Sequence, residues 1–247
     1  MPYLFLSPST QEFNPYATTG NEEYWMNLLA DRMEPYLLAS GIGFTRNDPD
    51  LNAAAAIRQS NAGEYDFHLA LHSNAAPESS AGGYRGIDIY YYPTSTEGLR
   101  MASILVDNLK TVYPLPDLVR ALPTRAIGEV RRTEAPSVLA ELGYHDNQED
   151  ALWIENNLDA IARTLVLGVT EYFGVPFIEP TPVRQGIVTV QSGRLNIRAL
   201  PSTASPILTT ANNGDQMYIY GESGNWYSVT YNGITGYAST AFVTVNP

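Results

Sequence analysis

One histidine and two glutamates stand where the chain could use them for hydrolytic chemistry. His72 follows the apolar run Leu69–Leu71 in "FHLALHSNAAP", Glu23 stands at the head of an amphipathic segment, and Glu141 lies at the end of "SVLAEL", one residue before Leu142. A strand buried on both faces is a continuous apolar run, and ligands of open α/β sheets gather at the carboxyl ends of strands. Histidine and carboxylate ligands hold zinc in hydrolases, and a separate carboxylate moves protons. If the fold brings the three side chains together, they predict a metal hydrolase.

The elements that must position these residues alternate between strand-like and helix-like patterns over the first 176 residues or so. This alternation predicts an α/β fold, a mostly parallel sheet flanked by helices. Strands are expected at 3–7, 67–73, 86–93 and 137–142, and helices at 21–40, 52–62, 97–113 and 150–173.

The sequence pattern changes after about residue 176, which divides the chain into two regions. Residues 176–185 contain three prolines, at 176, 180 and 182, and are predicted to form a stiff linker. Residues 186–247 carry short alternating runs broken by turns such as "NNGD" and "YNGITG". Asn-Gly between apolar strands is a strong hairpin signal, so a small all-β domain is expected there. The predicted domains are therefore 1–175 and 186–247.

Composition excludes several classes of function. The chain has 247 residues and no cysteine, which excludes disulfides, thiolate metal sites and cysteine nucleophiles. Its net charge of −12 argues against a nucleic-acid partner, because phosphates need a basic surface. No apolar stretch approaches the roughly 20 residues of a membrane span. The first ten residues lack the basic region of a signal peptide.

Four segments in order resemble the zinc-dependent N-acetylmuramoyl-L-alanine amidases of bacterial cell walls and phage lysins. They are "NEEYWMNLLAD", "LHSNAAP", "IDIYYY" and "RRTEAPSVLAELGYHDN", and the resemblance covers residues 3 to about 174. It implies that Glu23 and His72 bind zinc, that Glu141 activates the attacking water, and that Arg131 lies near the active site. Apart from this alignment with the family, Glu23 could equally be an ordinary acid in the first turn of a helix. The same reading applies to Glu22.

The chain departs from the family at the first zinc ligand. The family has a histidine after its first strand, whereas this chain reads "LSPSTQEFN", with Thr10 and Gln11 at that place. An amide oxygen is a poorer zinc ligand than imidazole. Gln11 is the expected replacement, and Thr10, His145 or a water molecule are the alternatives. His68 is a weaker candidate, because it lies further back on the strand that carries His72.

The C-terminal region resembles the bacterial SH3-like modules that accompany cell-wall hydrolases. The resemblance rests on "GRLNIRALPSTASPIL" and on "NNGDQMYIYGESGNWYSVTYNGITGYASTAFV". It implies a small β-barrel that targets the enzyme to the wall.

The expected function is hydrolysis of the amide between N-acetylmuramic acid and the L-alanine of the peptidoglycan stem peptide, with zinc as cofactor. One alternative is a degenerate, non-catalytic amidase-like protein that binds wall peptides, and another is a metallopeptidase of different specificity. The expected place of action is the cell wall or the extracellular space, as an autolysin or a phage endolysin. The sequence does not indicate the oligomeric state.

Overall fold

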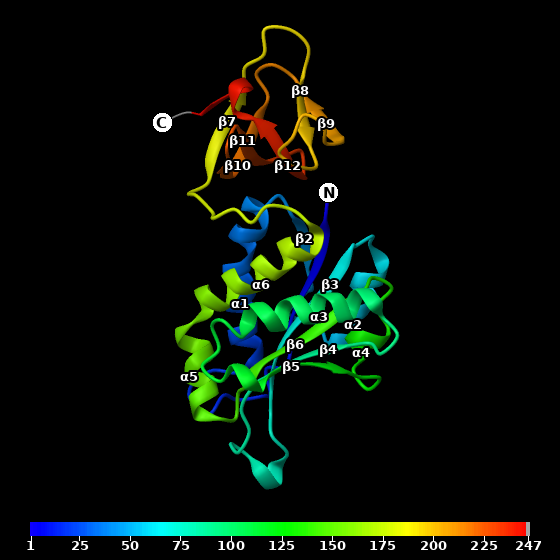
Figure 1. The fold of residues 1–247 in the computed structure, drawn as a ribbon, viewed down its shortest axis with the longest axis vertical. Coiled ribbons are helices and arrows are strands. Elements are labelled where there is room, and N and C mark those ends of the chain that lie inside the picture. The colour runs from blue at the N-terminus through cyan, green and yellow to red at the C-terminus, as the bar shows by residue number, and fades with distance from the viewer. Residues whose placement is uncertain (246–247) are drawn as a thin grey trace. The chain divides into compact units, whose positions relative to one another are not determined.

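The computed structural model describes residues 1–245, which contain two β-sheets (Figure 1). The first sheet has six strands in the order β2-β1-β3-β6-β4-β5. Their bounds are β1 Tyr3–Pro8, β2 Gly43–Arg46, β3 Phe67–Asn74, β4 Ile87–Tyr91, β5 Val119–Pro123 and β6 Ser137–Tyr144. The pairs β1–β3, β3–β6 and β4–β5 are parallel, and β4 runs antiparallel to β6. The expected α/β class is confirmed.

Helices connect these strands. They are α1 Glu22–Ala39, α2 Ala53–Ala62, α3 Thr96–Leu109, α4 Gly128–Arg131, α5 Gln148–Asn156 and α6 Leu158–Phe173, with short 3₁₀ turns at Glu78–Ser80 and Pro116–Leu118. The single helix expected at 150–173 is two helices in the structure. Asn157 interrupts it with non-helical backbone angles, φ −127° and ψ 20°, and its side-chain amide donates to the Trp153 carbonyl.

The central strands β3 and β6 hold the two most informative residues in register. Both strands are buried along nearly their whole length, because helices cover the two faces of the sheet. In the parallel β3–β6 pair, His72 stands opposite Glu141. In the antiparallel β6–β4 pair, Glu141 stands opposite Asp88. The sheet therefore aligns one histidine and two acids across three neighbouring strands.

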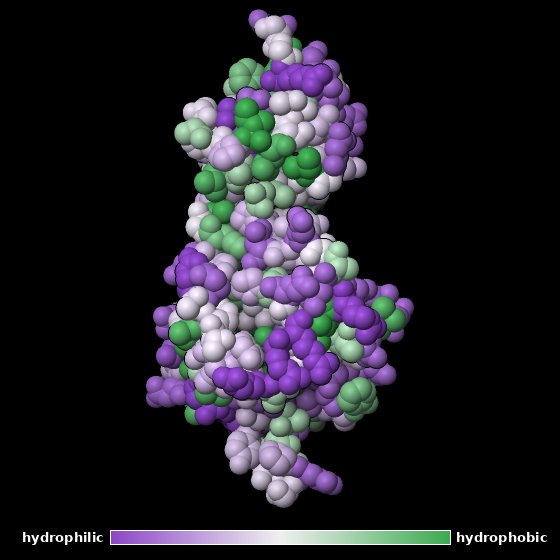
Figure 2. All heavy atoms as spheres, turned by 90° about the vertical axis from the view of Figure 1, so that its right-hand side faces the viewer, coloured by the Kyte–Doolittle hydropathy of each residue, from purple (hydrophilic) through white to green (hydrophobic). Residues whose placement is uncertain are grey.

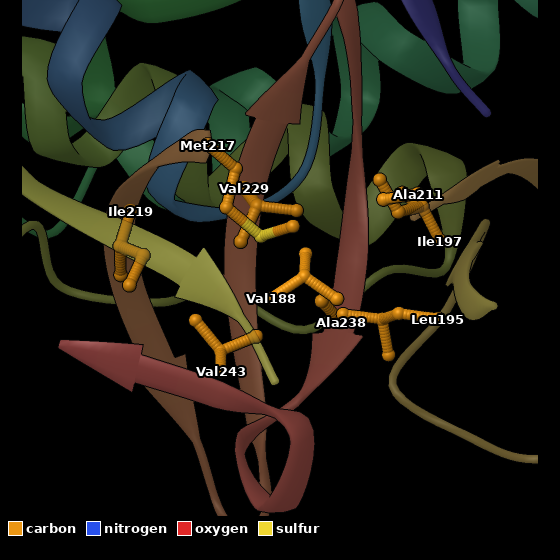
Figure 3. Close-up of a cluster of buried hydrophobic side chains, with 9 residues drawn as sticks. All are labelled: Val188, Leu195, Ile197, Ala211, Met217, Ile219, Val229, Ala238 and Val243. Atoms are coloured by element: carbon orange, nitrogen blue, oxygen red, sulfur yellow. The ribbon is translucent and has the colours of Figure 1, made fainter. Parts of the chain in front are cut away.

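The second sheet is all antiparallel, as expected for the C-terminal region. Its order is β13-β7-β10-β11-β12-β8-β9. The bounds are β7 Arg184–Val188, β8 Leu195–Arg198, β9 Ile207–Ala211, β10 Gln216–Ser223, β11 Trp226–Tyr231, β12 Ile234–Ser239 and β13 Val243–Val245. Nine buried apolar side chains from these strands form one core, which Figure 3 shows converging between them: Val188, Leu195, Ile197, Ala211, Met217, Ile219, Val229, Ala238 and Val243.

The chain forms two compact units. The first unit comprises residues 3–33 and 44–172, and the second comprises 1–2, 34–43 and the chain from 173 onward. Figure 2 shows mostly hydrophilic residues on the visible face of the first unit and a group of hydrophobic ones on that of the second. No helix in residues 1–245 is both long and apolar enough to cross a membrane.

Candidate active site

His72 is the centre of a buried polar cluster in the first unit. Its side chain is 7% exposed, and both ring nitrogens meet carboxylates. Nδ1 donates to Glu22 Oε1 at 2.8 Å, and Nε2 donates to Glu129 Oε2 at 3.2 Å. These two hydrogen bonds and the nearby negative charges raise the pKa of His72 well above its usual value, although burial alone would lower it. The two carboxylates therefore favour the protonated form of the His72 ring.

The glutamate beside His72 is Glu22, whereas the sequence pattern selected Glu23. Glu22 is 1% exposed, and its second oxygen accepts from Asn14 Nδ2 at 2.6 Å. Glu23 is partly exposed and lines a different cleft of about 450 Å³, together with Thr10 and Phe13. Neighbouring residues of an α-helix point about 100° apart, so the two acids at the start of α1 cannot face the same site.

The loop after β1 supplies a third group. Gln11 Nε2 lies 3.3 Å from His72 Nδ1, and Gln11 Oε1 accepts from Asn14 Nδ2 at 3.3 Å. Thr10 lines the cleft of Glu23 and also borders a cavity of about 10 Å³ that His72 and Glu129 line. Of the two loop residues considered for the missing ligand, Gln11 is thus the one whose side chain meets the Nδ1 edge of His72.

Glu141 lies in mid-strand on β6, directly across from His72. Its Oε2 atom is buried and has no hydrogen-bond partner. Burial raises the pKa of Glu141 to about 7, and the charges of Glu22, Asp88 and Glu129 add to the rise while His72 opposes it. A carboxyl group that titrates near neutral pH can both accept and deliver a proton, which is what a general acid–base residue needs.

This raised pKa predicts how the stability of the metal-free protein depends on pH. Between pH 4.5 and about 7 the folded Glu141 binds more protons than the unfolded one, so stability falls as pH rises through this window. The loss is at most about 3 kcal/mol. Thermal unfolding of wild type and Glu141→Gln at pH 5 and pH 8 should show the variant gaining stability relative to wild type at the higher pH. An equal difference at both pH values would contradict the shift.

The remaining sequence candidates have other surroundings. His145 is buried, donates from Nδ1 to the Ser73 carbonyl at 2.8 Å, and stacks on the Tyr16 ring. Arg131 is exposed and lines a separate cleft of about 230 Å³ beside the start of β6. Neither residue has a described contact with His72 or Glu141.

Sequence reasoning did not anticipate the role of Glu129. This residue is 4% exposed on the four-residue helix α4, and it contacts His68 as well as His72. The hydrogen bonds from His68 and His72 hold the pKa of its carboxyl well below the usual range, despite burial. The only signal in the sequence is an acid between apolar neighbours in "AIGEVRR", and such a pattern is too short to predict a site.

The donor set fits zinc in part. Imidazole nitrogen and carboxylate oxygen are ordinary zinc ligands, and His72 Nδ1 and Glu22 provide one of each. Their present separation of 2.8 Å is a hydrogen bond, and a tetrahedral ion between them would need about 3.4 Å. The third donor on this edge is the neutral amide of Gln11. Within residues 1–245, no three His, Cys, Asp or Glu side chains are already arranged as a metal site.

The second unit contains a groove of about 470 Å³. Its lining includes Arg194, Arg198, Trp226 and Phe242. These arginines are the only two cationic side chains between residues 186 and 247. The groove therefore combines aromatic surface with the positive charge of this region and suits an anionic ligand.

Comparison with known proteins adds two family matches. The family described as N-acetylmuramoyl-L-alanine amidase matches residues 12–171, and the bacterial SH3 domain family matches residues 193–244. No curated protein matches the chain significantly.

Solved structures resemble the first unit in fold. The CwlD amidase from Clostridioides difficile, solved with the GerS lipoprotein, is 15% identical with a TM-score of 0.61, covering 70% of this chain and 99% of its own. The catalytic domain of the amidase CwlV from Bacillus (Paenibacillus) polymyxa is 18% identical with a TM-score of 0.60, covering 71% and 100%. The catalytic domain of the CD27L endolysin, which targets Clostridia difficile, is 20% identical with a TM-score of 0.58, covering 69% and 98%.

Proposed function

Because the chain belongs to the N-acetylmuramoyl-L-alanine amidase family, we propose that it uses zinc to hydrolyse the amide between N-acetylmuramic acid and L-alanine in peptidoglycan. The observation that supports the proposal is the position of His72 on β3, where it bonds to Glu22 of helix α1 and stands opposite Glu141 of the neighbouring strand β6. His72 Nδ1 and Glu22 would hold the metal, and Gln11 or a water molecule would complete the set. When bound, zinc supplies Lewis acidity to the scissile carbonyl and to the attacking water.

Glu141 carries the proton chemistry in this proposal. Its free Oε2 can accept a proton from the attacking water, and the same carboxyl can deliver it to the departing amine. A pKa near 7 serves both steps, because neither form is strongly favoured at neutral pH. Asn14 holds Glu22 and Glu129 holds His72, so the two proposed ligands approach the site from fixed neighbours.

Purified peptidoglycan provides the direct test. We expect the protein to release new L-alanine amino termini, to lose this activity when zinc is chelated, and to regain it when zinc is restored. Cleavage of peptides that lack muramic acid would instead indicate a metallopeptidase. A chain that binds wall fragments without cutting them in the presence of zinc would support the alternative of a degenerate, non-catalytic amidase-like protein. This alternative is favoured by the absence of the family's first histidine from its expected position, where the chain has Thr10 and Gln11.

The SH3 domain is proposed to bind the wall through its groove. Stem peptides carry free carboxylates, and the groove holds Arg194 and Arg198 next to Trp226. Arg198 already donates to the Ser205 carbonyl at 2.7 Å, which leaves Arg194 as the better probe. This binding would raise the concentration of the enzyme at its polymeric substrate. The place of action would be the cell wall, reached as an autolysin or as a released lysin.

Co-sedimentation of the full chain with peptidoglycan measures this binding. We expect Arg194→Ala to weaken it severalfold, and Arg132→Ala, which removes an exposed arginine of the first unit, to leave it unchanged. Equal binding by the two variants would remove the groove from the proposal.

A further inference from the structure

Glu129 is a buried carboxylate that the proposed reaction does not use. Burying a carboxylate is costly unless it is paired and hydrogen-bonded. Glu129 has three such partners on two other elements, β1 and β3. Oε1 accepts from Ser7 Oγ of β1 at 2.6 Å and from His68 Nε2 of β3 at 3.2 Å, and Oε2 accepts from His72 Nε2 at 3.2 Å. The His68 ring is itself fixed by a 3.0 Å contact between Nδ1 and Ser60 Oγ of α2.

The two oxygens of Glu129 have separate partners, and this division argues against a role limited to bonding His68. Pairing with His68 and Ser7 occupies Oε1 alone. Oε2 is left for the Nε2 edge of His72. The opposite edge of the same ring, at Nδ1, meets Glu22 and Gln11. Each edge of His72 therefore has its own environment, one closed by a fixed carboxylate and one facing the proposed ligand set.

We propose that Glu129 is a positioning residue that holds the Nε2 proton of His72 and so reserves Nδ1 for the metal. The inference rests on the proposed function, in which His72 is a zinc ligand. A hydrogen bond to one ring nitrogen of a histidine decides which nitrogen is free to ligate, and a carboxylate partner also makes the imidazole a better ligand. Ser7 and His68 would act through Glu129 by fixing the orientation of its carboxyl group.

Nuclear magnetic resonance of the histidine ring protons tests this assignment. In the metal-free wild type, the His72 Nε2 proton should be visible and protected from exchange with water, because it is bonded to a buried carboxylate. Addition of zinc should remove the Nδ1 proton and leave the Nε2 proton in place. Loss of the Nε2 proton in place of the Nδ1 proton would overturn the proposal.

Variants separate positioning from simple structural support. Glu129→Ala should abolish protection of the Nε2 proton and weaken zinc binding by about 10–100-fold. Glu129→Gln should reduce the protection of the Nε2 proton and the zinc affinity by smaller amounts than Glu129→Ala. It still has an amide oxygen, but this oxygen can accept from only one of the two histidines. Glu134→Ala makes the same change at an exposed glutamate outside this cluster, so it serves as the control and should retain both the protected proton and the zinc affinity.

Each result decides the question. An Nε2 proton that stays protected in folded Glu129→Ala, or unchanged zinc affinity in that variant, would overturn the proposal. If Glu129→Ala does not fold, a Glu129→Gln variant with wild-type proton protection and wild-type zinc affinity would also overturn the proposal. A wild-type chain that binds no zinc would refute the proposed function, whereas the hold of Glu129 on the Nε2 proton is judged separately, because the protected proton and its loss in the variants are measured without metal.

Discussion

Glu141→Gln should lower amidase turnover by about 10²–10⁴, the usual range when general acid–base catalysis is removed. Glutamine keeps the size of the side chain and can still form hydrogen bonds, but it cannot accept or deliver the proton. Zinc binding should be unchanged, since Glu141 Oε2 makes no contact that holds His72 or Glu22 in place. Turnover on purified peptidoglycan and the zinc content of the same preparation are the two measurements.

A matched control strengthens this comparison. Glu134→Gln makes the same chemical change at an exposed glutamate three residues before β6, and it should retain wild-type turnover. Near-normal turnover in Glu141→Gln would make Glu141 a structural residue, and the proton transfers proposed for it would have to be reassigned. Loss of zinc together with activity would instead make Glu141 part of the metal site.

The positions of His72 and Glu141 could be predicted because both lie on buried central strands. A long apolar run in an α/β chain gives the strand, and a polar residue near its end is conspicuous. The mutual register of β3 and β6 could not be predicted from either run. It places the two residues directly opposite one another, and it is set by the packing of the whole sheet.

Other parts of the site depend on contacts that leave no periodic signal. Glu129 lies on a four-residue helix, and its partners come from β1 and β3, more than fifty residues away in sequence. His145, an alternative zinc ligand by sequence, instead stacks on the Tyr16 ring and bonds to the Ser73 carbonyl. The short strands β2 and β5 were also absent from the sequence prediction. β2 has only four residues, and β5, "VRALP", ends in a proline and has only one buried residue, so neither gives a clear apolar alternation.

The first turn of α1 shows how a family motif and a structure can disagree by one residue. The family resemblance of "NEEYWMNLLAD" implies Glu23 as the ligand, whereas the helix presents Glu22 to His72. Asn21 fixes the start of this turn, since its side-chain oxygen accepts the backbone N–H of Tyr24 at 2.8 Å. The rotational phase of the helix therefore decides which acid reaches the site.

The variants Glu22→Gln and Glu23→Gln test which of the two acids binds the metal. Replacing Glu22 should cost more zinc affinity than the 10–100-fold typical of an outer-shell partner, because a direct carboxylate ligand becomes a neutral amide. Glu23→Gln changes the same chemistry on the adjacent residue and should leave zinc affinity within about threefold, well below that outer-shell range. Competition with a chelating dye measures both. The reverse order would mean that metal binding rotates the first turn of α1 into the family's register, and Glu22 would then be only a partner of the unloaded histidine.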